Sequence, residues 1–309
     1  MFRKVIVGFD GSDRALGCPL ARPGAHSLRG GELIVCCVHH FQPLSARIDP
    51  TEPSIDRESA EESVEQATRL VERGVTVTSK FLAGVSTART LQSTAIAEQA
   101  DLIVLGSSHR GALGRVLMGS VTHETLREAP CPVAIAPIGL HDHLAGTRLA
   151  CVAVGHDAVE PTPDALSAGV ALCVQTGAKL LLVAVAQDAA VADPARDTMP
   201  YAEITEARLC AAEQVLAEAL RSLPESISAT SEVRDGDPAE QLLEVSRDAD
   251  LLVLGSHGRG FVGRLIMGSV CDRVVRAAAC AVLVVPPSKS TDAPASKRLS
   301  PAISSAHGS

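Results

Sequence analysis

The stretch LLVLGSHGRGFVGRLIMGSV, residues 251–270, runs from an apolar segment into a loop that carries five glycines. A near copy, LIVLGSSHRGALGRVLMGSV, occupies residues 102–121, where His109 stands at the position that matches Gly258. Repetition of such a long segment indicates a repeated structural unit. The sequence on either side of the loop should then repeat as well.

The flanking sequence does repeat. KVIVGFDGS near the start matches LACVAVGHDAV in the second half, and Asp157 lies 147 residues after Asp10. Gly255 lies 149 residues after Gly106, so only about two residues of insertion separate the halves. The 309 residues suffice for two domains, each with its own core.

We expect a first domain over residues 1–140 and a second over residues 148–288, joined by the polar, turn-rich stretch GLHDHLAGT. Residues 289–309 are rich in Ser, Ala and Pro, which predicts a disordered tail.

Strand-like and helix-like patterns alternate within each half. Short apolar runs such as KVIVGF and DLLVLG predict buried strands, and longer mixed patterns such as residues 59–72 predict helices. Asp237 followed by Pro238 predicts the start of a helix, with Asp237 as the N-cap. Strands that alternate with helices predict a parallel sheet with helices on both faces.

Composition excludes several classes of function. A net charge of −8 without a long Lys/Arg run, and only 2% aromatic residues, argue against a nucleic-acid partner. No apolar stretch reaches the ~20 residues that cross a bilayer, and the start lacks a signal-peptide core. We therefore expect a soluble, cytoplasmic protein without a membrane partner. The nine cysteines sit mostly inside apolar runs and are expected to be buried thiols rather than metal ligands.

The glycine loop predicts a phosphate cradle. It lies between a strand and a helix at the carboxyl edge of the predicted sheet, where ligands of such folds bind. Ser269 is expected to cap the following helix, with Asp272 completing a capping box. Glycine lets the backbone approach an anion closely, and a helix start offers unpaired N–H groups. Gly255, Gly258, Gly268 and Ser269 are the expected cradle.

Arginines add to this interpretation. Arg259 in the second half and Arg110 in the first follow the position of Gly258 and its match, where they could contact phosphate. The alternative is that the glycines only shape turns and the arginines form a solvated surface.

The spacing itself carries a family resemblance. Glycine, two residues, glycine, nine residues, glycine and serine resembles the nucleotide-binding signature of ATP-binding universal stress proteins. The resemblance extends to VGFDGS, to the CPV strand and to the order of elements across residues 1–288. It implies two tandem Rossmann-like domains of the adenine-nucleotide α-hydrolase type. Each would hold a five-stranded parallel sheet in the order 3-2-1-4-5 with helices on both faces.

The resemblance also implies a ligand, ATP, with Mg²⁺ as the only expected metal and no metal site made of protein side chains alone. Aspartates after the first strands would bind adenosine, and valines of the second strands would contact adenine through their backbone. Glycines before the aspartates are expected to keep the strand ends open. The expected ATP-binding residues are Gly8, Asp10, Val38, Gly106, Arg110, Gly119, Ser120 and Val121 in the first half, and Gly155, Asp157, Val185, Gly255, Gly258, Arg259, Gly268, Ser269 and Val270 in the second.

Each half departs from the family pattern once. His109 replaces a signature glycine in the first half, where it either obstructs the site or hydrogen-bonds a phosphate. In the second half VGHDAVEP replaces the small Gly-Ser turn, which affects the adenosine side. Binding is therefore expected first in the second half.

Three functions remain open from the sequence. The first is an ATP-binding regulator of the stress response. The second is a slow ATP hydrolase or autophosphorylating enzyme, although no Walker lysine and no catalytic residue can be named. The third is an interaction protein that dimerises without nucleotide. The resemblance implies that the fifth strands pair the two halves as an internal pseudo-dimer, and two chains could associate further as a homodimer.

Overall fold

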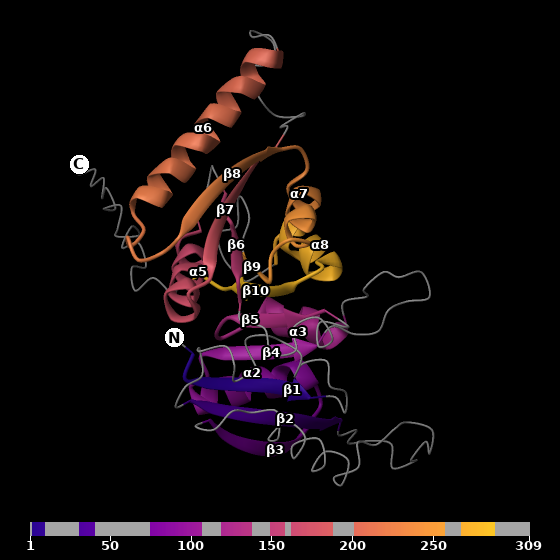
Figure 1. The fold of residues 1–309 in the computed structure, drawn as a ribbon. Helices are drawn as coiled ribbons and strands as arrows, with labels where there is room; N and C mark the ends of the chain where they lie inside the picture. Colours follow the sequence, from indigo (N-terminus) through magenta and orange to yellow (C-terminus); the bar gives the residue numbers. More distant parts are fainter. Residues whose placement is uncertain are drawn as a thin grey trace, which may run out of the picture.

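The computed structural model of the chain describes residues 2–9, 31–40, 75–106, 119–137, 149–157, 162–187, 201–256 and 267–287. Within these residues ten strands form one sheet, and helices pack on both of its faces. Figure 1 shows the strands stacked from β8 at one end to β3 at the other. The tandem α/β architecture expected from the sequence is confirmed.

The two halves contribute matching elements. The first half contributes β1 (Lys4–Phe9), β2 (Glu32–His40), β3 (Thr76–Gly84), α2 (Thr87–Glu98), β4 (Leu102–Gly106), α3 (Ser120–Arg127) and β5 (Val133–Ala136). The second half contributes β6 (Cys151–Gly155), α5 (Pro163–Thr176), β7 (Lys179–Ala186), α6 (Tyr201–Arg221), β8 (Ala229–Asp235), α7 (Pro238–Val245), β9 (Leu251–Gly255), α8 (Ser269–Ala277) and β10 (Ala281–Val285).

The strand order is β3-β2-β1-β4-β5-β10-β9-β6-β7-β8. In each half the strands therefore lie in the order third, second, first, fourth, fifth, as the family resemblance implies. All pairs within a half are parallel, whereas β5 and β10 pair antiparallel, with Val282 opposite Ile135 and Val284 opposite Val133. The fifth strands thus join the halves into one continuous sheet.

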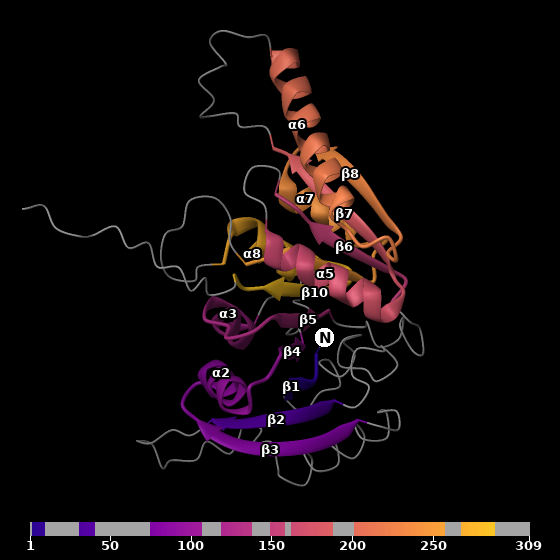
Figure 2. The ribbon, with the colours of Figure 1, turned by 90° about the vertical axis from the view of Figure 1, so that its left-hand side faces the viewer.

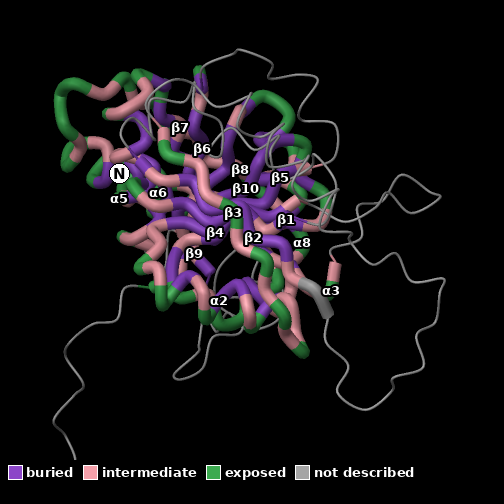
Figure 3. Tube along the Cα trace, turned by 90° about the horizontal axis from the view of Figure 1, so that it is seen from below, coloured by how far each residue is buried: buried purple, intermediate pink, exposed green. Residues whose placement is uncertain are grey.

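The central strands are buried on both faces. All five residues of β10 and all four of β5 are buried, and in β4 and β9 only the final glycine is partly exposed. A parallel strand covered by helices on both faces must be apolar throughout, which explains the uninterrupted runs LIVL and LLVL. Figure 3 shows these strands as the buried interior of the molecule.

Two apolar layers cover the sheet. One layer includes Leu172 of α5 and Leu216 of α6. The other includes residues from helices of both halves, with Leu91 of α2 and Leu242 of α7 among them. Figure 1 shows α5 and α6 on one side of the second half's strands, and α7 and α8 on the other, and Figure 2 shows α2, α3 and α8 along one side.

An aspartate joins the first and fourth strands in each half. Asp101, before β4, accepts hydrogen bonds at Oδ2 from the N–H groups of Arg3 and Lys4, at 2.8 and 3.0 Å. Asp250, before β9, accepts them from Ala150 and Cys151, at 2.6 and 2.9 Å. Because strands one and four are neighbours in each half, this repeated contact holds their amino ends together, at the edge of the sheet opposite the candidate site.

Some sequence predictions fall outside the described residues. They are the helix over residues 59–72, the linker at 139–147 and the disordered tail at 289–309. Among the helices that are described, none is long and apolar enough to span a membrane.

Candidate functional site

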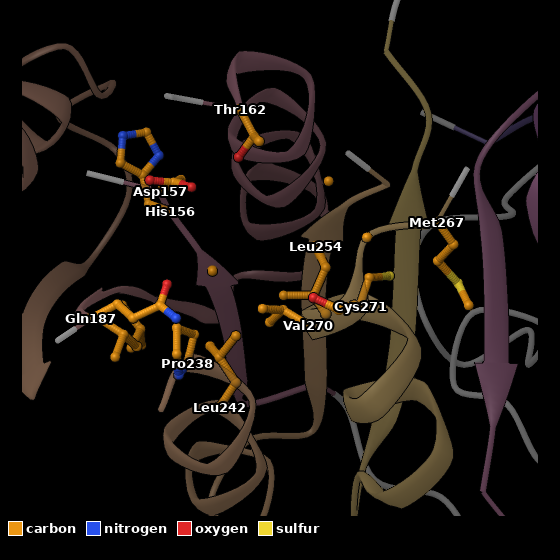
Figure 4. Close-up of a pocket in the computed structure, with 16 residues that line it drawn as sticks. His156, Asp157, Thr162, Gln187, Pro238, Leu242, Leu254, Met267, Val270 and Cys271 are labelled. Atoms are coloured by element: carbon orange, nitrogen blue, oxygen red, sulfur yellow. The ribbon is translucent and has the colours of Figure 1, made fainter. Parts of the chain in front are cut away.

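A cavity of about 500 Å³ lies at the carboxyl edge of the second half's sheet. It is bounded by the ends of β6, β7 and β9 and by the starts of α5, α7 and α8, as Figure 4 shows. Its described lining consists of Gly155, His156, Asp157, Thr162, Val183, Val185, Gln187, Pro238, Leu242, Leu254, Gly255, Met267, Gly268, Ser269, Val270 and Cys271.

Seven residues expected from the sequence meet in this cavity. They come from the ends of β6, β7 and β9 and from the start of α8, and they are Gly155, Asp157, Val185, Gly255, Gly268, Ser269 and Val270. Gly258 and Arg259 lie outside the described residues. The structure thus brings together every second-half position that it describes from the expected set.

Backbone hydrogen bonds hold the two ends of the glycine loop together. The Ser256 N–H donates to the Val285 carbonyl oxygen at 2.9 Å, which continues the pairing of β9 with β10. The Gly268 N–H donates to the Ser256 carbonyl oxygen at 3.1 Å. The start of α8 is therefore held beside the end of β9, at the rim of the cavity.

The start of α8 differs from the expectation that Ser269 is its N-cap. The N-cap is Gly268, with φ −61° and ψ 150°, and no side chain caps the helix. The Asp272 N–H donates to the Gly268 carbonyl oxygen at 2.9 Å, and the Asp272 carboxylate bonds Arg276 instead of completing a capping box. The helix begins one residue earlier because glycine takes the extended cap conformation and leaves Ser269 as the first helical residue.

The helices that start around the cavity differ in what bonds their first backbone N–H groups. At α7, the Asp237 carboxylate accepts from the Glu240 N–H at 2.9 Å and pairs with Arg273 at 2.8 Å. The Arg273 guanidinium holds the pKa of Asp237 below its usual value. At α5 and at α8 no side-chain cap occupies the first N–H groups, but α5 begins with Pro163, which has no N–H to offer. Because those groups carry the positive end of the helix dipole, α8 is the helix start best suited to an anion.

The opposite part of the cavity is apolar. Val183 and Val185 of β7, Leu242 of α7 and Leu254 of β9 line it. No aromatic residue lines the cavity among the described residues. An uncharged ring bound here would therefore pack between aliphatic side chains, and backbone groups would form its hydrogen bonds.

The expectation that Gly8 and Gly155 keep the strand ends open needs correcting. A Cβ at Gly155 would lie 2.7 Å from Leu254 Cδ2, and one at Gly8 would lie 2.6 Å from Leu105 Cδ2. Each glycine thus makes room for a leucine of the neighbouring fourth strand. Gly155 still lines the cavity, but a side chain of the protein fills the space that its missing Cβ leaves.

Three polar residues of the cavity were not expected from the sequence: His156, Thr162 and Gln187. His156 stands where the first half has Phe9, a substitution of a polar for an apolar residue that could have signalled the site. Burial lowers the pKa of His156, opposed by the charge of Asp157. His156 Nδ1 and Thr162 Oγ1 are buried, with no hydrogen-bond partner in the described part of the chain.

The apolar lining was also missed in part. Pro238, Leu242, Met267 and Cys271 approach the cavity from helices or from the segment before a helix. Burial raises the pKa of the Cys271 thiol to about 12, so this group is neutral at physiological pH. No pattern near these residues distinguishes them from ordinary core positions.

The first half places its expected residues at matching points of the fold. Gly8 and Gly106 lie near or at the ends of β1 and β4, and Val38 lies in β2. Gly119 is the N-cap of α3, with φ −63° and ψ 154°, and Ser120 and Val121 begin that helix. Asp10, His109 and Arg110 lie outside the described residues. The described residues gather no cluster of three metal-ligating side chains in either half.

Comparison with known proteins gives the family. A family model described as the universal stress protein family matches residues 1–137 and again residues 151–286. A universal stress protein of Mycobacterium tuberculosis is 34% identical over 193 residues, which cover 61% of this chain and 63% of that protein, less than two thirds of its length. A universal stress protein of Mycolicibacterium smegmatis is 32% identical over 239 residues, covering 74% and 78% of the two chains.

The fold has the same relatives. The crystal structure of a universal stress protein from Archaeoglobus fulgidus superposes with a TM-score of 0.63 at 20% identity, covering 93% of this chain and 99% of that one. At this identity the likeness concerns the fold alone, and it extends over both halves. The chain therefore belongs to the universal stress protein family, with one family domain in each half.

Proposed function

We propose that this protein binds ATP in the cavity of its second half and acts as a nucleotide-dependent regulator in the stress response. One observation carries the proposal: seven residues of the expected nucleotide site, drawn from four separate elements, line a single cavity of about 500 Å³. That volume falls within the range of small-molecule sites.

The electrostatics supports one orientation of the ligand. The triphosphate, with Mg²⁺ bound to it, lies at the uncapped start of α8, where Ser269 and Val270 present backbone N–H groups. The adenosine lies over the end of β6, beside Asp157. The base lies against the aliphatic wall that includes Val185 and Leu242.

The second half is the primary site in this proposal. Its signature glycines are unbroken, whereas His109 interrupts the signature in the first half. The uncapped starts of α3 and α8 are alike, with Gly119 and Gly268 as extended N-caps. The first half is therefore a weaker site or an empty one, and the difference lies in the loop rather than in the helix start.

Matched substitutions test the site. Ser269 and Ser120 are both exposed first residues of uncapped helices. Glutamate at either position interacts favourably with the helix dipole, so Ser269→Glu and Ser120→Glu should both fold. Its carboxylate also repels a triphosphate and should therefore weaken binding. Calorimetric titration of nucleotide-free protein with MgATP should show that Ser269→Glu removes the tighter site, while Ser120→Glu leaves that site unchanged.

The outcomes separate the three candidate functions. Unchanged ATP affinity in Ser269→Glu would contradict the proposal, and failure of the wild-type protein to bind ATP would favour the nucleotide-independent interaction protein. Mass spectrometry of nucleotide released from the purified protein gives the stoichiometry of one or two per chain. The hydrolase would be favoured if the wild type turns over labelled ATP faster than buffer alone and Ser269→Glu abolishes this turnover.

A further inference from the structure

The cavity extends across three neighbouring strand ends. β9 leads into the glycine loop and α8, β6 lies next to β9, and β7 lies beyond β6. Neighbouring strands are about 4.8 Å apart, so the end of β7 lies roughly 10 Å from the end of β9. A nucleotide whose phosphates lie at the start of α8 therefore carries its base to β7.

The β7 end of the cavity is apolar except at one position. Val183, Val185, Pro238 and Leu242 form its walls. Gln187, the residue after β7, is the only described lining residue at this end with a side chain that forms hydrogen bonds. Figure 4 shows Gln187 on the side of Pro238 and Leu242, away from Met267 and Cys271, with its carboxamide turned toward Pro238.

The Gln187 side chain is exposed, and the described residues offer it no hydrogen-bond partner. A carboxamide carries one acceptor oxygen and two donor N–H bonds. The edge of adenine presents the complementary pair, an amino donor beside a ring-nitrogen acceptor, and glutamine binds such an edge with two hydrogen bonds.

We propose that Gln187 hydrogen-bonds the edge of the base and determines the base specificity of the second-half site. This inference rests on the proposed function, because it requires a nucleotide in the cavity. Gln187 acts at the end of the cavity opposite the phosphates, so its contribution can be measured separately from theirs.

Two probes separate the ends of the site. Full-length Gln187→Leu should bind MgATP about tenfold more weakly, as expected for the loss of one or two hydrogen bonds at a binding site. Its affinity for inorganic tripolyphosphate, which lacks a base, should stay unchanged. Ser269→Glu should weaken both ligands. Gln214→Leu is the matched control, since Gln214 is exposed on α6 outside the cavity lining and should leave both affinities unchanged.

A second substitution tests the chemistry rather than the loss of a side chain. Gln187→Glu keeps the shape but replaces the donor N–H groups by an acceptor. A carboxylate cannot donate to the ring nitrogen of adenine but accepts from the ring N–H and the amino group of guanine. The ratio of GTP affinity to ATP affinity should therefore rise at least about tenfold.

The results distinguish failure of the inference from failure of the proposed function. The role of Gln187 alone would be overturned if the wild type binds ATP and Gln187→Leu binds it with an affinity within twofold of the wild type. An unchanged ratio of GTP affinity to ATP affinity in Gln187→Glu would overturn it as well. Equal weakening of tripolyphosphate and ATP by Gln187→Leu would also overturn it. Absence of ATP binding by the wild type would overturn both proposals.

Discussion

The Gly268 N–H donates a hydrogen bond to the Ser256 carbonyl oxygen at 3.1 Å, across the ten residues 257–266 that lie outside the described structure. Ser256 is itself bonded to Val285 of β10. The start of α8 is thus held at the sheet edge by backbone groups on both sides of the glycine loop. A binding site whose helix start is already in position loses less entropy when the ligand arrives.

Gly268 adopts φ −61°, a value open to any residue, so its backbone conformation does not require glycine. We expect Gly268→Ala to fold, because no positive φ is lost, with a melting temperature lowered by about 2–4 °C because alanine is a poorer N-cap than glycine. Its added methyl group stands beside the first N–H groups of α8 and should weaken MgATP binding about tenfold or more. Gly119→Ala, at the matching position of α3, is the control and should leave the tighter site unchanged. Equal ATP affinity in both variants would show that Gly268 serves packing alone.

Asp250 should stabilise the second half through the hydrogen bonds that it accepts from two backbone N–H groups. Asp250→Ala leaves both donors without this partner, and we expect it to reduce the free energy of unfolding by about 1–3 kcal/mol. Asp250→Asn keeps an acceptor oxygen and should lose less. Urea unfolding measures the difference, with Asp248→Ala, at an exposed neighbouring position, as the control. A loss in Asp248→Ala as large as that in Asp250→Ala would argue against a specific role for the contact.

Asp237 gives the second half a pH-dependent contribution to stability. Its pKa is lowered in the folded protein by Arg273 and by the Glu240 N–H. A lowered pKa stabilises the fold above the unfolded-state pKa near 4, and the gain is lost as the pH falls through the folded-state pKa. Asp237→Asn keeps the cap but not the charge, so its deficit against the wild type should shrink between about pH 5 and pH 3. The deficit at pH 7 should be below about 1 kcal/mol, because both partners are substantially exposed.

Ser86 provides the uncharged comparison for that measurement. It caps α2 in the first half by accepting from the Arg89 N–H at 3.3 Å. The Ser86 hydroxyl also donates to Glu124 Oε1 at 3.1 Å, so the comparison is made in a Glu124→Gln background. There Ser86→Ala should reduce the free energy of unfolding by about 1 kcal/mol at both pH 5 and pH 3. A pH dependence of the Ser86→Ala deficit equal to that of Asp237→Asn would contradict the assignment to the Asp237 charge.

Thiol reactivity should follow burial. Burial raises the pKa of Cys36, Cys131, Cys173, Cys271 and Cys280 to about 12, so these groups remain thiols at pH 8. Cys210 is exposed on α6 and should react with iodoacetamide first among the described cysteines. Peptide mass spectrometry after brief alkylation measures the order. Modification of Cys271 as fast as Cys210 would mean that the cavity wall opens in solution.

Local patterns in the sequence were sufficient for much of the fold. The apolar runs of β4 and β9 predicted buried strands, because only a strand covered on both faces tolerates no polar residue. Asp237 and Pro238 predicted the start of α7, and the structure confirms the cap. The repeat predicted two copies of one unit. Each of these features can be recognised from the order of the residues alone, without knowing how distant segments pack.

The sequence by itself determined the tandem α/β halves, and its glycine loop together with the family resemblance predicted the seven residues that line the cavity. Only the tertiary structure decided that Gly268 caps α8, that Gly155 makes room for Leu254, and that Thr162 and Gln187 reach the same cavity. The physical reason is distance along the chain. The start of α7 at Asp237 and Pro238 follows from neighbouring residues. A cavity wall, and the placing of Gly268 beside Ser256, depend on how separate helices and strands pack against one another.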